Sequence, residues 1–385
     1  MKSKIIRLKS PEKWKRSTKT DLIFLIYVIA ISIFGTVCVF SAGQAYAYAR
    51  YNDQYYFIKK QLIWLAIGFV AMYAGSRVNW KYLKNLSPHF YIFTLLLLVL
   101  VLVIGFVGNG AKRWISIGPL TIQPSEIAKL TMIMMLAYYF DVYEKMATMQ
   151  KKDLKTFVYG TFYPCIIMIV PIILVMLQHH LSCIIILGLI GLLVILSAGI
   201  NPRYISLFCA IGVVAVTFLA LFTDYTKDRI TAWQNPEAYK LTGGWQTLQG
   251  LMAIGSGGLF GVGFGNSILK HCYVSEPAND MIFSILCEEL GFVGALTVFI
   301  LFGLLVTRGF FIALKATNTY ARILVIGICI KTSVQVLLNV AVVTNTIPNT
   351  GISLPFFSYG GSSLVMLFFE MGIILSISKE TKIGK

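Results

Sequence analysis

One carboxylate, Asp280, stands where a long polar segment meets a strongly apolar one that begins Met281-Ile282-Phe283. A carboxylate at such an edge is partly desolvated, which raises its pKa and makes it a better acceptor for the proton of a substrate hydroxyl. Asn279 or Asp280 would equally serve as the N-cap of the helix that follows. The residue types alone favour the cap and leave the general base as the alternative.

Upstream of Asp280, six glycines fall within the eleven residues 255–265. Glycine lets a backbone approach something bulky or anionic closely. A nucleotide-binding fingerprint is a poor explanation, because no strand and helix of a soluble βαβ unit frame the run. The whole segment 223–280 is the only long connection, and its Trp233 and Trp245 favour a functional loop over a mobile tether.

A second polar segment, residues 110–129, reads GAKRWISIGPLTIQPSEIAK. Pro124 and Glu126 are typical of the first turn of a helix, where proline needs no donor and a carboxylate suits the positive helix end. Lys112 and Arg113 either anchor the chain at the membrane interface or hold phosphates, to which arginine donates bidentate hydrogen bonds. The residues leave both interpretations open.

A third segment, residues 345–363, combines two prolines, three glycines and several hydroxyls with apolar residues. Irregular backbone of this kind survives near lipid only if it is buried in protein or lines a cavity. The three segments all fall on one side of the predicted topology. We therefore expect them to share one cavity.

The elements that must position these segments are membrane helices. Hydrophobic residues make up 57% of the 385 residues and charged residues only 13%, against about 25% charged in soluble domains. A helix that crosses the hydrocarbon needs about 20 largely apolar residues. This criterion predicts ten spans, at 21–42, 57–75, 89–107, 126–143, 157–177, 181–199, 204–222, 281–307, 321–343 and 357–377.

The basic residues set the orientation. Most Lys and Arg outside the spans fall on the side of the two termini, so the positive-inside rule places both termini in the cytoplasm. We accordingly expect a basic cytoplasmic tail at 1–20, one ten-helix membrane domain at 21–377 with the extracytoplasmic loop 223–280 between its seventh and eighth helices, and a second cytoplasmic tail at 378–385.

The formal net charge of +17 raises the question of nucleic-acid binding. The positive residues sit between apolar runs, and no RNP-like or zinc-finger pattern accompanies them, so we expect no nucleic-acid partner. The seven cysteines are scattered singly, which indicates neither a disulfide nor a zinc framework.

Charges within the predicted spans are expensive and need partners. Lys331 lies near the middle of the ninth span, Glu288 and Glu289 about two turns into the eighth, and Glu370 deep in the tenth. We predict that Lys331 pairs with one of these glutamates.

In this order the motifs resemble the SEDS family (shape, elongation, division and sporulation), the FtsW/RodA/SpoVE group, from about residue 20 to 377. The resemblance rests on four stretches: GAKRW with QPSEIAK at 110–129, the glycine run with Lys270, Asp280 with CEELG at 287–291, and LPFFSYGGSS at 354–363. The glycine run followed by Ser267 and Lys270 is more similar to the division and sporulation branch than to the elongation branch.

The resemblance implies an all-α polytopic protein of the bacterial cytoplasmic membrane, a glycosyltransferase that polymerises lipid II on the outer face. The 4-hydroxyl of one lipid-linked disaccharide would attack the anomeric carbon of an undecaprenyl-linked glycan, and undecaprenyl pyrophosphate would leave. The resemblance makes Asp280 the essential residue and general base. It makes candidate substrate ligands of Lys112, Arg113, Lys129, Arg229, Lys270, Glu276, Ser358 and Ser362, and structural residues of Glu126, Glu288, Glu289, Lys331 and Glu370.

The same resemblance admits a divalent cation, magnesium or manganese, although no ligand set can be read from the sequence. It requires no nucleotide, because the pyrophosphate linkage already holds the energy. The expected partners are a class B penicillin-binding protein and other division or elongation proteins.

The sequence departs from the family's pattern at two places, and two other functions remain as alternatives. The family's Gln-Pro-Asp-Leu-Gly is here Gln178-His-His-Leu-Ser182, so the role of that acidic residue does not carry over, and we interpret His179 and His180 as a polar loop tip. Ser275 replaces the proline before the glutamate of the long loop. A flippase for the same lipid would show paired broken helices around a midplane site, and a non-catalytic division scaffold would tolerate the loss of Asp280.

Overall fold

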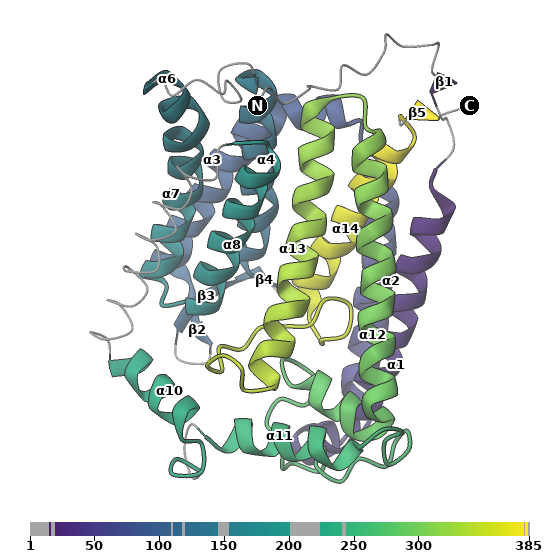
Figure 1. The fold of residues 1–385 in the computed structure, drawn as a ribbon. Coiled ribbons are helices and arrows are strands. Elements are labelled where there is room, and N and C mark those ends of the chain that lie inside the picture. The colour runs from purple at the N-terminus through teal and green to yellow at the C-terminus, as the bar shows by residue number, and fades with distance from the viewer. Residues whose placement is uncertain are drawn as a thin grey trace, which may run out of the picture.

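The computed structural model describes residues 15–16, 20–108, 111–117, 120–144, 154–200, 224–240, 244–380 and 382–383. Helices that run side by side form most of it, and two shorter helices lie across one end of the bundle (Figure 1). The helices are α1 Leu22–Tyr51, α2 Tyr56–Arg77, α3 Trp80–Ile104, α4 Pro124–Val142, α6 Leu154–Phe157, a π-helical turn Val158–Phe162, α7 Tyr163–Leu177, α8 Leu181–Ser197, α10 Asp224–Gln234, α11 Trp245–Gly257, α12 Ile282–Lys315, α13 Thr319–Val343 and α14 Gly361–Ser378.

Short strands occur at both ends of the bundle. β1 (Lys15–Arg16) pairs with β5 (Lys382–Ile383), while β2 (Phe106–Gly108), β3 (Ala111–Ile117) and β4 (Leu120–Ile122) form an antiparallel sheet in that order. We call the end with β1 and β5 the termini face and the end with α10 and α11 the loop face (Figure 1).

The prediction of an all-α polytopic membrane protein is confirmed, while the number of ten spans stays a prediction. Seven of the described helices are long and apolar enough to cross a membrane, and α8 is a shorter apolar helix. Nine of the ten predicted spans coincide with helices, and the tenth, 204–222, lies outside the described residues. The last span is four residues shorter than predicted at its start, because 357–360 belong to the irregular segment before α14.

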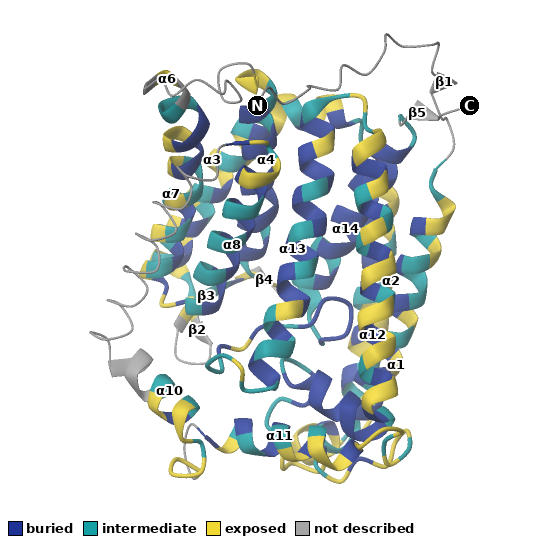
Figure 2. Cartoon of the chain, in the orientation of Figure 1, coloured by how far each residue is buried: buried dark blue, intermediate teal, exposed yellow. Residues whose placement is uncertain are grey.

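Exposed residues lie along the outside of the bundle (Figure 2), and many of them are large and apolar. Val70, Val103 and Ile300 are 68%, 72% and 52% exposed. A soluble protein rarely exposes such a continuous apolar surface. In a membrane protein, lipid acyl chains cover these side chains. These helices therefore carry apolar residues on their outer faces as well as in the core. The orientation of the bundle in the membrane, the two cytoplasmic tails and the division of the chain into domains stay predictions.

Small residues allow the closest helix packing in the bundle, between α2 and α14. A Cβ on Gly75 would lie 2.7 Å from the carbonyl oxygen of Phe369, and one on Gly372 would lie 2.3 Å from that of Met72. Small residues at a membrane helix contact let the backbones approach and gain van der Waals contacts. This contact brings the start of α14 beside the start of α2 at the loop face.

The glycine run does not do what its composition suggested. It approaches the backbone of α12, where a Cβ on Gly257 would lie 1.9 Å from the carbonyl oxygen of Cys287 and one on Gly261 2.2 Å from that of Glu289. At this point α12 is itself broken, since Gly291 has φ 64° and ψ −161°. The close approach at Gly257 and Gly261 is therefore to protein backbone.

Candidate active site

A cavity of about 770 Å³ opens at the loop face, where the starts of α2, α4, α8 and α14 meet the irregular segments. All three polar segments singled out in the sequence contribute to it, so the predicted shared cavity is confirmed. Its lining includes Lys60, Ile63, Trp64, Arg113, Trp114, Thr121, Gln123, Glu126, Lys129, His180, Ser182, Cys183, Ile186, Glu276, Asn279, Asp280, Gln335, Gly351, Ile352, Ser353, Tyr359, Gly360, Gly361, Ser362 and Ser363.

Asp280 lines this cavity as a half-buried carboxylate. Its Oδ1 is inaccessible to solvent and accepts no hydrogen bond from the described residues. Desolvation raises the pKa of Asp280 to about 6, with a further upward contribution from Glu276, against the stabilising effects of its own backbone N–H, Arg229 and Gln246. The cap interpretation is wrong, because α12 starts after Met281 and no described side chain caps it.

The backbone around Asp280 is held from two sides. Asn339 of α13 donates from its amide nitrogen to the Asp280 carbonyl at 2.9 Å and to the Ile352 carbonyl at 2.6 Å. Ser358 donates to the Asn279 carbonyl at 2.7 Å and accepts from the Leu354 N–H at 2.7 Å. These bonds make Ser358 a positioning residue, while Ser362 lies on the cavity wall itself.

Gly351 leaves room beside the carboxylate. A Cβ there would lie 3.2 Å from Asp280 Oδ2, and the φ of +67° is one that side chains disfavour. Glu276 also lines the cavity and accepts a 2.5 Å hydrogen bond from the Asn279 amide.

Three cations line the same cavity, and besides the exposed Lys60 they are Arg113 and Lys129. Arg113 donates from Nη2 to the carbonyl oxygen of His179 at 2.7 Å, while its Nε is buried with no partner among the described residues. Lys129, almost fully buried, donates to Glu126 at 2.7 Å, and both lie on the wall. Lys112 is exposed and falls outside the lining.

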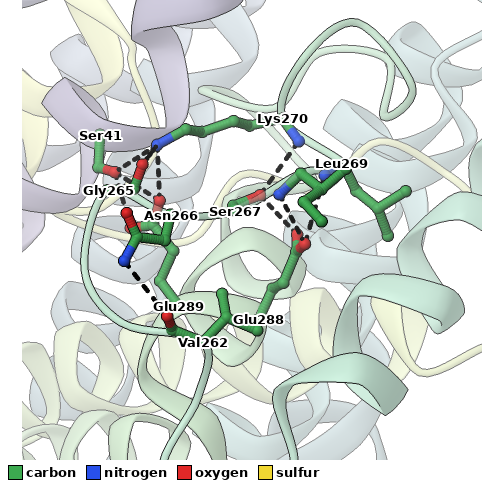
Figure 3. A network of polar contacts seen from close by, with 10 residues as sticks. Ser41, Val262, Gly265, Asn266, Ser267, Leu269, Lys270, Glu288 and Glu289 are labelled. Carbon is green, nitrogen blue, oxygen red and sulfur yellow. Dashed lines mark hydrogen bonds and ion pairs between the residues drawn. The ribbon is translucent and has the colours of Figure 1, made fainter.

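The other two predicted cations lie away from the lining. Arg229 donates to the Asn349 carbonyl at 2.7 Å, and its charge lowers the pKa of Asp280. Lys270 is buried, and its ammonium contacts Glu289 at 2.8 Å, the Gly265 carbonyl at 2.7 Å and Ser41 at 3.2 Å (Figure 3). The geometry gives Lys270 a structural role and no contact with the cavity.

The charges inside the spans are paired. Lys331 forms an ion pair with Glu370, as predicted, with both side chains fully buried. Glu288 accepts from the Ser267 hydroxyl and from the N–H groups of Ile268 and Leu269, so it fastens the loop before it (Figure 3). Glu126 differs from the other structural acids, since it lies on the cavity wall beside Lys129.

Sequence reasoning missed His180. The expectation of a polar loop tip is wrong for it, because His180 is 9% exposed and lines the cavity, with Nδ1 unpaired among the described residues. Burial first, and then the nearby charges of Arg113 and Lys129, lower the pKa of His180 to about 3. Trp64, Gln335 and Tyr359 were also missed, since nothing in their local sequence marks them as wall residues.

A cation site was also sought. In the part of the chain that the structure describes, no three His, Cys, Asp or Glu side chains come together in a way that could hold a metal ion. The donor set of the cavity therefore does not fit a metal held by protein ligands alone.

Taken together, the bundle and its cavity define a polytopic membrane protein in which the half-buried carboxylate of Asp280 shares one chamber with cationic side chains. The chain belongs to the FtsW/RodA/SpoVE family of cell cycle proteins, whose model matches residues 21–383. The resemblance inferred from the motifs is thereby confirmed.

Two curated relatives extend over nearly the whole chain. It is 34% identical over 371 residues to a probable peptidoglycan glycosyltransferase FtsW of Geobacter sulfurreducens, covering 96% of this chain and 97% of that protein. It is 36% identical over 370 residues to the stage V sporulation protein E of Bacillus subtilis, covering 95% and 99%.

Solved structures share the fold. The chain matches a component of a peptidoglycan synthase complex, described as coordinating polymerization and crosslinking, with a TM-score of 0.76, 26% identity and coverage of 93% and 97%. It matches the rod shape determining protein RodA of Thermus thermophilus with a TM-score of 0.68, 26% identity and coverage of 94% and 97%.

Proposed function

We propose that this protein is a peptidoglycan glycosyltransferase that polymerises lipid II into glycan strands at the outer face of the bacterial cytoplasmic membrane. The names of its full-length relatives support this activity. The observation that carries the proposal is Asp280: a desolvated carboxylate with an unpaired oxygen, in one cavity with Arg113 and Lys129.

In the proposed reaction Asp280 accepts the proton of the 4-hydroxyl of one lipid-linked disaccharide. The hydroxyl oxygen attacks the anomeric carbon of the second substrate, and the bond to the undecaprenyl pyrophosphate breaks. A base with a pKa of about 6 is ionised at neutral pH and still accepts a proton well.

The leaving pyrophosphate gains negative charge and needs cations nearby. Arg113 suits this task best, because its Nε is an unused donor on the cavity wall. Lys129 already shares its charge with Glu126, so its contribution depends on how that pair rearranges. Magnesium or manganese stays a proposal, and we derive no step through it because the described residues offer no ligand cluster.

We further propose that a class B penicillin-binding protein is the partner and that the protein serves division or sporulation. The match to a synthase complex and the similarity to FtsW and to the sporulation protein support both points. A flippase is less well supported, since the cavity lies among helix starts at one face and not at the middle of the bundle.

The test is glycan-strand synthesis from purified lipid II by the reconstituted protein with that partner, with and without a divalent cation. We expect Asp280→Asn to lose about 10²- to 10⁴-fold in rate, the usual contribution of a general base. Asp53→Asn is the matched control, because Asp53 lies on an exposed loop and pairs only with Lys59. Wild-type rates from Asp280→Asn would overturn the assignment of the base.

A further inference from the structure

The loop that follows α11, residues 258–268, presents an apolar surface that the proposed reaction does not use. We call it the glycine loop. It contains no charged residue, and Phe260 is 80% exposed. Its other large exposed side chains are Leu259, Val262, Phe264 and Ile268. A contiguous apolar patch of this kind marks a contact with lipid or with another molecule.

Part of the backbone of the glycine loop is paired with the backbone of α12. The N–H groups of Val262 and Gly263 donate to the carbonyls of Glu288 and Glu289 at 2.9 and 3.1 Å. In return, the carbonyls of Gly258 and Leu259 accept from Phe292 and Val293 at 2.9 and 3.1 Å, across the break in α12. Backbone that meets hydrocarbon must be paired in this way, whereas a loop in water has no such need.

The charges beside the glycine loop are turned inward. Lys270 and Glu289 form an ion pair with 3% of each side chain exposed, and Ser41 bonds to both (Figure 3). The Glu288 carboxylate accepts hydrogen bonds from the Ser267 hydroxyl and the Ile268 N–H, both within the glycine loop. No formal charge of this network therefore faces outward, which is the condition for contact with lipid.

The position of the glycine loop along the bundle axis follows from the distance between Phe292, which it contacts, and the polar end of α12. Arg308 pairs with Asp21 at 2.7 Å near the termini face, which marks one polar boundary. At about 1.5 Å per residue, Phe292 stands about 24 Å from Arg308, inside a hydrocarbon layer of about 30 Å. The surface is also continuous, because Phe292 and Ile300 of α12 are 60% and 52% exposed.

We propose that the glycine loop lies in the membrane, at the hydrocarbon boundary of the loop face, and that lipid acyl chains cover its apolar side chains. Trp245 and Tyr273, both exposed and joined by a 2.9 Å hydrogen bond from the indole to the Tyr273 carbonyl, fit the interfacial level above it. The glycine loop thus belongs to the membrane domain and not to the aqueous part of the 223–280 segment.

The test is the accessibility of a nitroxide to oxygen, which concentrates in hydrocarbon, and to a polar nickel chelate, which stays in water. The full-length protein is reconstituted alone in liposomes, with Cys272 replaced by Ser because it is exposed and Cys209 replaced because it lies outside the described residues. Single labels are placed through Phe260→Cys and Ile268→Cys. Ile300→Cys on α12 is the hydrocarbon control and Glu237→Cys is the aqueous control.

We expect the ratio of oxygen to nickel accessibility at 260 and 268 to be nearer to the value at 300 than to that at 237. A ratio at 260 equal to that at 237 would overturn the proposal. So would a label that becomes protected only after a penicillin-binding protein is added, since the surface would then be a protein interface. The measurement needs no polymerase activity, so it stands independently of the proposed function.

Discussion

At the scale of single residues, the protonation of Asp280 makes the sharpest prediction. Desolvation raises its pKa to about 6, so the carboxylate is increasingly protonated as the pH falls through that value and cannot then accept a proton. We expect kcat/KM for polymerisation to be level above about pH 7 and to fall about tenfold per pH unit well below pH 6. Initial rates on lipid II across this range measure the midpoint.

His180 supplies the control for this profile. Its pKa of about 3 keeps the imidazole neutral throughout the window, although it lines the same cavity. His180→Asn should therefore leave the midpoint of the acid limb unchanged, whatever it does to the rate itself. A midpoint that moves with His180→Asn would show that Asp280 is not the group that titrates.

Single residues also show how much of the candidate site could be predicted from the sequence. The polar motifs marked Asp280 and Arg113 as candidates with more than one interpretation, and the family resemblance made Asp280 the base and Arg113 and Lys129 substrate ligands; the cavity contains all three. Lys270 stands in an equally good motif but turns to Glu289. Which way a side chain faces depends on tertiary packing, and local composition does not contain that information.

At the scale of elements, the buried pair of Lys331 on α13 and Glu370 on α14 should hold those helices in register. Removing one partner leaves an unpaired buried charge, so we expect Lys331→Met or Glu370→Gln to cost about 3 to 5 kcal/mol in unfolding free energy. The double variant should recover most of this loss. Thermal unfolding in detergent measures all three.

The comparison pair is Lys59 and Asp53, at 2.8 Å but exposed to solvent. Breaking it should change the unfolding temperature little, because solvent screens an exposed pair. Equal losses from both pairs would contradict the interpretation that burial, and not the ion pair itself, sets the cost at Lys331.

Two glycines of the run at 255–265 distinguish the effect of close packing on stability from the effect of backbone flexibility. Gly261 has φ +78° and a Cβ there would lie 2.2 Å from the Glu289 carbonyl, so Gly261→Ala should cost more than about 1 kcal/mol. Gly255, in α11, meets nothing within 4 Å, and Gly255→Ala should be neutral or stabilising by up to about 1 kcal/mol. Unfolding of the two variants side by side would contradict this account if Gly255→Ala were the more damaging.

The helices themselves were largely predictable because runs of apolar residues report lipid contact directly. The break at Gly291 was not, since an apolar run such as the start of α12 looks the same whether its backbone is continuous or interrupted. The interruption depends on hydrogen bonds from residues 258–263, which lie about thirty positions earlier in the chain.

At the scale of the whole molecule, the starts of α2, α4, α8 and α14 contribute to the cavity, and β1 and β5 lie at the other end of the bundle (Figure 1). Basic residues gather near the helix ends of the termini face, where they include Arg77, Lys81, Lys84, Lys315, Arg322 and Lys379. By the positive-inside rule we expect this face to be cytoplasmic and the cavity to be extracytoplasmic.

This orientation can be tested in intact cells with a membrane-impermeant maleimide, in the same background lacking Cys209 and Cys272. A cysteine at Glu237, on the loop face, should react at once, while one at Lys382 should react only after the membrane is permeabilised. The reverse pattern would place the cavity in the cytoplasm. It would then contradict polymerisation at the outer face even if Asp280 were essential, because the base would stand on the wrong side of the membrane from the growing glycan.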